Sequence, residues 1–211
     1  MVRPVEPTSQ AIVDAAYILF WRKGFHRVSL DEIAAEADVT KRTLYYHFES
    51  KDALLSAVLE AQSKLAFAAF QTFGVNLIGS PEQIVEKLFA ALSAWSAKPR
   101  WAGSGFTRLV IELADLPGHP AHEIARRHKG AVERHLAEVL ARAGVDLPTE
   151  RAREIYLLAE GAMSLILVHG NQSYASAAAE AAKRLLQDSA NLPVAKSQML
   201  TSAGFSRAAE G

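Results

Sequence analysis

A cluster of cations and aromatic side chains lies between residues 40 and 51, where the sequence reads TKRTLYYHFESK. Lysine, tyrosine and histidine can donate hydrogen bonds to phosphate oxygens, and lysine or arginine near a helix start can donate to the edge of guanine. Lys41, Arg42 and Lys51 outweigh the single acid, Glu49. This chemistry is typical of a surface that contacts nucleic acid, although an ordinary surface helix with two half-exposed tyrosines would have the same composition.

Two helix-start signals place the cluster on the second of two short, closely spaced helices. Ser29 and Glu32 have the spacing of a capping box, which predicts a helix from about residue 30 to about 37. Thr40 is a second N-cap residue, so only a tight turn at 37–39 separates the two helices. Helix, tight turn, helix is the supersecondary motif that many proteins use to read DNA, and it is also the arrangement of a plain helical hairpin.

On a helical wheel, Leu44 and Phe48 fall together and are expected to face the core. The outward side carries Arg42, Thr43 and Tyr46, flanked by Tyr45 and His47. Lys41 lies nearer to the core side, but its long stem can carry the charge outward. This outward face fits a DNA major groove, because arginine and lysine donate to guanine and a threonine methyl group can contact that of thymine.

The composition of the whole chain limits its chemistry. The 211 residues are 50% hydrophobic and 22% charged, with 23 basic and 23 acidic side chains, so bulk charge gives no support for a nucleic-acid partner. Cysteine is absent, which excludes disulfides and cysteine-based metal sites. No apolar run approaches the roughly 18 residues of a membrane span, and the N-terminus lacks the apolar region of a signal peptide. We therefore expect a cytoplasmic protein without a membrane partner.

Apolar residues follow helical spacing nearly throughout the chain, which predicts an all-α protein of about nine helices. Gly24 closes the first helix as a left-handed C′ residue. A long helix from about 51 to 73 joins the first module to the rest of the chain. The later helices are expected between Pro81 and Pro99 and over about 104–115, 121–143, 150–169 and 174–190.

The run from residue 11 to 55 resembles the DNA-binding domain of the tetracycline-repressor (TetR) family of transcriptional regulators. The matching stretches are AAYILFWRKGF and VSLDEIAAEADVTKRTLYYHFESKDALL, and LYYHF followed by Lys51 is their most specific part. The order of the helices is also similar to that of the family. The resemblance implies a helix-turn-helix domain over 1–55, a helical ligand-binding and dimerisation domain over 56–193, and a flexible tail over 194–211.

The resemblance also implies which residues contact DNA. Those expected to hold the DNA backbone are Ser29, Thr40, Tyr45, Tyr46, His47 and Lys51, and those expected to face the bases are Lys41, Arg42 and Thr43. Two positions depart from the family pattern. Asp38 stands in the turn where the family usually has glycine, and aspartate tolerates the left-handed conformation better than most residues. Arg42 stands where the family often has a small residue, so it either gives this protein its own base preference or reaches a phosphate.

The second half of the chain resembles the family only loosely, and its role rests on its own residues. The helix of about 150–169 is apolar on most sides, which indicates burial against more than one neighbour. The helix of about 174–190 has a face of small residues, Ala175, Ala178, Ala179 and Ala182. We expect these helices to form a four-helix bundle with those of a second copy, although alanine also simply favours helix.

Aromatic and polar residues of the second half are candidates for an effector pocket, because ligand pockets are mostly apolar with a few polar groups. The candidates are Phe67, Phe70, Phe89, Trp95, Trp101, Phe106, Tyr156, Glu160 and Met163, and Glu112 is a further polar candidate. A helical core needs aromatic residues in any case, so core packing is the competing interpretation. His119, His122, His128 and His135 form a loose group that fits a solvated helix face better than a metal site. We expect no cofactor.

The function that we expect is a homodimeric repressor, released from a palindromic double-stranded DNA operator by a small apolar or amphipathic effector. The alternative is an activator, or a ligand-free DNA-binding protein, on the same fold. The sequence has no glycine-rich phosphate loop, nucleophile elbow or HExxH motif. Pairs such as Glu112 with Asp115, or Glu160 with His169, have no spacing that demands catalysis, so we do not expect an enzyme.

Overall fold

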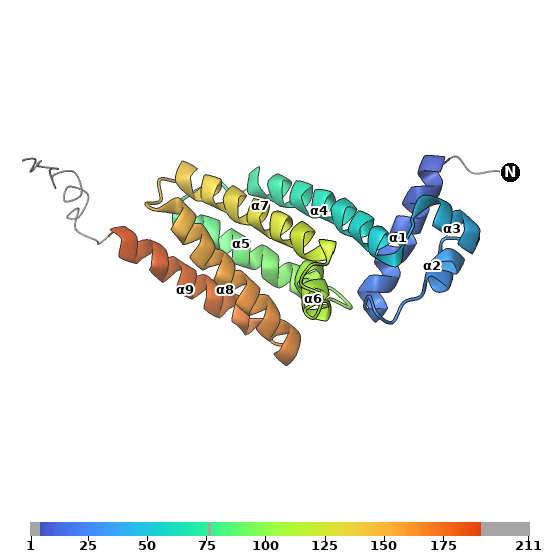
Figure 1. The fold of residues 1–211 in the computed structure, drawn as a ribbon. Helices are drawn as coiled ribbons and strands as arrows, with labels where there is room; N and C mark the ends of the chain where they lie inside the picture. The colour runs from blue at the N-terminus through green and yellow to red at the C-terminus, as the bar shows by residue number, and fades with distance from the viewer. Residues whose placement is uncertain (1–4, 76, 191–211) are drawn as a thin grey trace, which may run out of the picture.

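The computed structural model describes residues 5–75 and 77–190, with side chains over 8–70 and 77–187, and this part of the chain forms nine α-helices and no strand (Figure 1). The helices are α1 (Val5–Lys23), α2 (Leu30–Glu36), α3 (Lys41–His47), α4 (Lys51–Val75), α5 (Pro81–Ser96), α6 (Gly105–Glu112), α7 (Pro120–Arg142), α8 (Pro148–His169) and α9 (Ser173–Ala190). The expected all-α class is confirmed. The expected tail over 194–211 lies outside the described residues.

Local capping interactions set the start of α2 and α3. Glu32 N donates to Ser29 Oγ at 3.2 Å and Ser29 N donates to the Glu32 carboxylate at 2.9 Å, which confirms the capping box. At the start of α3, Thr43 N donates to Thr40 Oγ1 at 3.1 Å. Between the helices, Asp38 has a φ of 53°, in the left-handed region that aspartate tolerates. The tight turn without glycine is therefore also confirmed.

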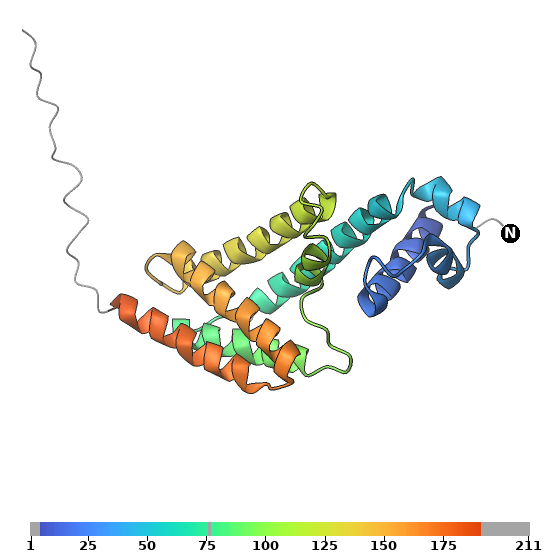
Figure 2. The same ribbon diagram turned by 60° about the horizontal axis from the view of Figure 1, so that its bottom comes forward.

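The first hydrophobic core holds α1–α3 against the start of α4. Ile12, Leu44, Leu54 and Leu55 are fully buried there. This core continues into the second half of the chain, because Phe106 of α6 and several residues of α7 belong to it. Figures 1 and 2 show α4 running from the α1–α3 module into the larger helical body, and residue 55, the expected domain boundary, lies inside this helix.

The second core joins α5, α7, α8 and α9. Ala175, Ala178 and Ala182 are buried in it, and Ala179 packs against it. The small-residue face of α9 thus contacts helices of its own chain, α5 and α8, and not a second copy. The close approach expected from these alanines does occur, but we assigned it to the wrong partner.

The stretch Lys51–Phe70 of α4 is long and apolar enough to cross a membrane by length and composition, with a mean hydropathy of 1.3. This finding differs from the expectation that no apolar run approaches the length of a membrane span. The same test is passed by core helices of other proteins. In this chain Leu54, Leu55, Val58 and Leu59 are buried in the first core. Their apolar character is explained by packing against α1.

Candidate nucleic-acid interface and junction cavity

Helix α3 lies at one end of the molecule (Figure 1), and its sequence is rich in aromatic and basic residues. Leu44 is fully buried and Phe48 packs against the first core, so the helix is anchored on the side that the helical wheel indicates. Tyr46 is 75% exposed and Tyr45 is 48% exposed. Arg42 is exposed as well, and it has no ion pair or hydrogen bond with any residue that the structure describes. Large exposed aromatic groups beside an unpaired cation are typical of a contact surface.

The other two residues expected to face the bases have partners on the protein. The Lys41 ammonium lies 2.9 Å from Asp31 Oδ1, and this hydrogen bond raises the pKa of Lys41. Both side chains are exposed, and exposed ion pairs contribute little, so Lys41 can leave Asp31 for DNA at small cost. The Thr43 hydroxyl lies 2.8 Å from that of Thr40. Of the three residues, Arg42 is thus the one that needs no rearrangement.

Among the residues expected to hold phosphate, Ser29 is tied into its capping box. Its hydroxyl donates to Glu32 Oε2 at 3.2 Å. A hydrogen bond from Lys23 at 2.8 Å, together with those from Ser29, lowers the pKa of Glu32 from 4.5 to about 2. The carboxylate therefore stays ionised at neutral pH, and Lys23 neutralises an acid that would otherwise repel a nearby phosphate.

Lys51 and His47 lie against aromatic rings. The Lys51 ammonium is 4.3 Å from the centroid of the Phe25 ring, a cation–π contact, and burial lowers the pKa of Lys51. The His47 ring meets the Tyr46 ring edge-on, with 5.2 Å between the centroids. Phe25 belongs to the turn between α1 and α2, so Lys51 connects α4 to this turn whether or not it also holds a phosphate.

Glu112, at the end of α6, is bonded to the same turn. Phe25 N and His26 N donate to its two carboxylate oxygens at 3.0 and 2.8 Å, and His26 Nε2 lies 3.2 Å from its carbonyl oxygen. Gly24 has a φ of 86°, and a Cβ there would lie 3.1 Å from the carboxylate. The glycine therefore provides both the turn and the room for Glu112. The sequence does not reveal these hydrogen bonds, which we call the Glu112 clamp, because Glu112 lies 87 residues from Phe25 and 86 residues from His26.

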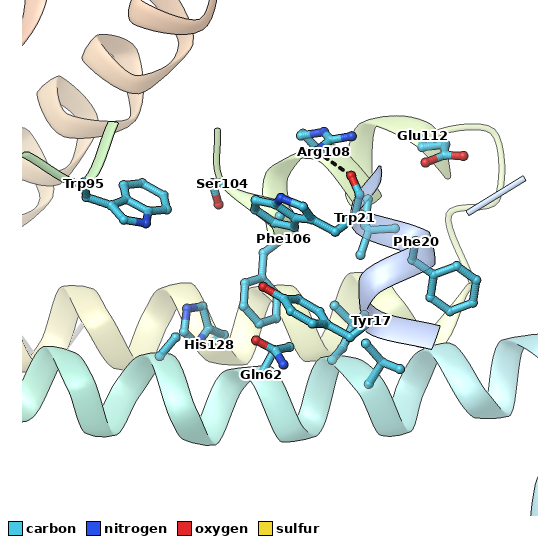
Figure 3. A pocket seen from close by; sticks show the side chains of 15 residues that line it. Tyr17, Phe20, Trp21, Gln62, Trp95, Ser104, Phe106, Arg108, Glu112 and His128 are labelled. Atoms are coloured by element: carbon cyan, nitrogen blue, oxygen red, sulfur yellow. Dashed lines mark hydrogen bonds between the residues drawn. The ribbon is translucent and has the colours of Figure 1, made fainter. Parts of the chain in front are cut away.

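A cavity of about 280 Å³, which we call the junction cavity, lies between α1 and α6 (Figure 3). Its main walls are Tyr17, Phe20, Trp21, Gln62, Phe106 and Arg108. Of the residues expected to line a pocket, Phe106, Trp95 and Glu112 do so here. The aromatic residues of α1 are not among the candidates, because the sequence predicts a pocket in the second half of the chain.

The other pocket candidates lie elsewhere. Phe89 is buried in the second core and Met163 is half-buried. Phe67 and Phe70 pack edge-on against one histidine, His135, with centroid separations of 6.0 and 5.5 Å. Trp101 packs edge-on against the Trp95 ring at 5.5 Å. These five aromatic and thioether side chains are thus dispersed and do not enclose one site.

Glu160 and Tyr156 belong to a polar cluster between α6, α7 and α8. The Glu160 carboxylate accepts hydrogen bonds from Lys129 Nζ at 2.6 Å and from the Thr107 hydroxyl at 3.0 Å. The Lys129 ammonium also lies 5.6 Å from the Tyr156 ring centroid. Burial raises the pKa of Tyr156 well above its usual value, so the phenol stays neutral. The charges of this cluster are paired within the chain.

Each histidine of the expected loose group has its own neighbour. His119 Nδ1 accepts a hydrogen bond from Ala121 N, His122 bonds the Leu113 carbonyl, His128 stacks on Phe106, and His135 packs against Phe67 and Phe70. Among the residues described, no group of three or more histidines or acids is arranged to hold a metal ion. The side chains of the group therefore pack separately.

The helix-turn-helix of α2 and α3, preceded by α1 and followed by a long α4 and further helices, defines a class of helical DNA-binding regulators. The family model described as bacterial regulatory proteins of the tetR family matches residues 12–58. Residues 12–58 thus match the DNA-binding domain of the TetR family of transcriptional regulators, and the relatives to which the chain is similar are regulators and not enzymes. The expected class of protein is thereby confirmed.

Three relatives illustrate how far the similarity extends. The HTH-type transcriptional regulator YjdC of Escherichia coli strain K12 is 27% identical over 177 residues, 84% of this chain and 90% of that protein. The Transposon Tn10 TetC protein of Escherichia coli is 49% identical over 55 residues, which is 26% of this chain and 28% of that protein. The crystal structure of SCO4454, a TetR-family transcriptional regulator from Streptomyces coelicolor, superposes with a TM-score of 0.76 at 25% identity, covering 87% of this chain and 96% of that one.

Proposed function

We propose that the protein is a homodimeric repressor that binds a palindromic operator and is released from it by a small apolar or amphipathic molecule. The observation that carries this proposal is the outward face of α3. Arg42, Tyr45 and Tyr46 project from a helix that buried Leu44 holds in place. A protein that acts on promoter DNA works in the bacterial cytoplasm, which is the location that we propose.

The side chains of α3 divide between two kinds of DNA contact. Arg42 would donate to base edges in the major groove, joined by Lys41 once it leaves Asp31 and by the Thr43 methyl group. The contacts to phosphate would come from Ser29, Thr40, Tyr45, Tyr46, His47 and Lys51. This division separates residues that set the operator sequence from residues that hold any DNA.

An exposed apolar stripe on α8 supports the proposed dimer. Leu157 is 72% exposed, Leu165 is 42% exposed and Val168 is 72% exposed, and their spacing places them on one side of the helix. Gly161 is exposed between them and lacks a side chain, so a second helix can approach closely. A second copy covering α8, with the outer face of α9 beside it, would bury this stripe.

Dimerisation would place two copies of α3 on two successive turns of the major groove. Proteins of this kind bind half-sites roughly 34–36 Å apart. Helix α4 is suited to transmit an effector signal, because its start lies in the first core while its later part packs on α7. A change in the angle between α4 helices of the dimer would move the recognition helices out of register with the half-sites.

A binding titration tests the proposed function. Fluorescent duplexes covering the protein's own promoter region are titrated at moderate salt against a scrambled duplex of the same length. We expect the promoter duplex to be bound at least about 10³-fold more tightly, as is usual for specific sites, with two protein chains per duplex in sedimentation. Equal affinity for both duplexes would contradict the proposal.

Val168→Glu should produce monomers that lose operator affinity, and the matched change Ala177→Glu on α9 tests whether that helix also takes part.

A further inference from the structure

The junction cavity is formed by both the DNA-binding module and the rest of the chain. Tyr17 and Trp21 enter it from α1, which supports the helix-turn-helix, and Phe106 enters it from α6 (Figure 3). Trp95 closes one side. Aromatic rings thus enter the cavity from three helices, and flat rings pack best against another ring, stacked with an offset or edge-on.

Of the six polar side chains that line the cavity, Ser104, Glu112 and His128 are hydrogen-bonded within the chain, while Arg108, Gln62 and Tyr17 have donors or acceptors to spare. Arg108 Nη1 donates to the Trp21 carbonyl oxygen at 3.4 Å, and its guanidinium lies 5.4 Å from the Trp21 ring centroid. The hydrogen bond is long, and most guanidinium donors remain available. The Gln62 amide and the Tyr17 hydroxyl make no hydrogen bond with any residue that the structure describes. Figure 3 shows both of them beside Phe106.

We propose that the junction cavity is the effector site and that its ligand is a flat aromatic acid with a bicyclic ring system. This inference rests on the proposed function, since it names the ligand and the site of that regulation. The ring would lie between the aromatic walls, and the carboxylate would pair with Arg108 through two parallel hydrogen bonds. A ring hydroxyl or carbonyl would meet Gln62 or Tyr17. The volume of about 280 Å³ is near the lower limit of ligand pockets, roughly 300–1,000 Å³, which favours a compact ligand.

Helix α6 connects this site to the DNA-binding module at three points. A Cβ on Gly105 would lie 2.4 Å from the Trp21 ring, so the glycine lets α1 rest directly on the first turn of α6. Arg108, in the middle of α6, donates to the Trp21 carbonyl of α1. Glu112, at the end of α6, accepts hydrogen bonds from the α1–α2 turn. A ligand carboxylate that pairs with Arg108 weakens the hydrogen bond from Arg108 to the Trp21 carbonyl. A ligand ring against Trp21 displaces the contact between Trp21 and Gly105. Occupancy of the cavity therefore changes how α1 is held, and with it the orientation of α3.

Calorimetric titration of the full-length protein, without DNA, tests the site. The probes are 2-naphthoate and its uncharged analogue 2-naphthalenemethanol. We expect 2-naphthoate to bind at least about tenfold more tightly, the ratio given by one charge-assisted hydrogen bond, and Arg108→Gln to remove this preference. Ala66→Trp should abolish binding, because Ala66 lines the cavity at the surface of α4 and the indole would fill it. Ala69→Trp is the matched control, since Ala69 is equally exposed on α4 but does not line the cavity.

Operator affinity of the same proteins separates the two proposals. We expect 2-naphthoate to weaken operator binding of the wild type and of Ala69→Trp, and to leave Ala66→Trp bound. Failure of 2-naphthoate to bind a wild-type protein that does recognise its operator would overturn the site alone, as would equal binding to Ala66→Trp and Ala69→Trp. Cavity binding in the expected pattern by a protein without operator preference would instead contradict the proposed function.

Discussion

The DNA interface and the junction cavity are built in different ways. Helix α3 takes its caps, its anchor and its exposed side chains from one short segment, and these side chains point away from the protein. The cavity takes its walls from five helices, α1 and α4–α7, and polar side chains of several of them are part of its lining. An interface that depends on one segment can be altered residue by residue. A cavity shared by several helices is in contact with each of them, so under our proposal a ligand there changes how the DNA-binding module is held.

Removing the anchor of α3 should have the largest effect. Leu44→Ala leaves a void at a fully buried position and should lower the free energy of unfolding by about 2–5 kcal/mol. Urea denaturation measures the loss. Tyr46→Ala on the same helix is the control, because Tyr46 is exposed and its removal should change stability by no more than about 0.5 kcal/mol while weakening binding to all DNA. Similar losses of stability in both variants would contradict this separation of faces.

Breaking the Glu112 clamp should have a smaller effect on stability and a distinct effect on function. Glu112→Ala leaves Phe25 N and His26 N without their acceptor and should cost about 1–3 kcal/mol in urea denaturation. The variant should also lose the weakening of operator binding by a cavity ligand, since we propose that α6 carries the ligand signal to the α1–α2 turn. Asp115→Ala, an exposed acid just beyond α6, is the control and should leave both measurements unchanged. A Glu112→Ala protein with full stability and full response would show that the clamp is incidental.

The parts of the fold that could be predicted are those decided within one or two helical turns. Ser29, Thr40 and Gly24 fix helix ends through hydrogen bonds to residues three or four positions away, so the helix limits were predicted to within a few residues. Asp38 could replace the usual turn glycine for an equally local reason, its tolerance of positive φ. The outward face of α3 followed from helical periodicity and the burial of Leu44.

Contacts between distant helices could not be predicted in the same way. The periodicity of α1 indicates which side of the helix is apolar, but it does not show that Tyr17 and Trp21 meet α6. The alanines of α9 indicated a close helix contact, yet spacing alone cannot tell a helix of the same chain from one of a second copy. Glu160 was recognised as a polar group in an apolar helix, while its partner Lys129 lies 31 residues earlier in the chain.

Arg42 and Lys51 test how the DNA interface divides its work. Arg42→Ala should change which operator variants bind best, by about 1–3 kcal/mol for a bidentate base contact. Lys51→Ala should weaken all duplexes alike and reduce the salt dependence by about one unit of log–log slope. Anisotropy titrations over a set of operator variants at several salt concentrations measure both. An unchanged ranking in Arg42→Ala would make Arg42 a phosphate contact, and an unchanged slope in Lys51→Ala would leave Lys51 only its contact with Phe25.

The acid dependence of the α2 capping box should be the smallest effect. The pKa of Glu32 is lowered from 4.5 to about 2 in the folded protein, first by Lys23 and then by Ser29. The ionised carboxylate therefore stabilises the fold at pH values above 4.5, and this contribution falls as the pH drops toward 2. Glu32→Gln should lower the unfolding temperature at neutral pH, and the difference from the wild type should shrink in acid. Lys23 and Glu32 are both exposed, so the difference in unfolding temperature should be small. Glu36→Gln, at the other end of α2 and outside the capping box, is the control, and parallel pH curves for the two variants would exclude a role of the ionised capping box.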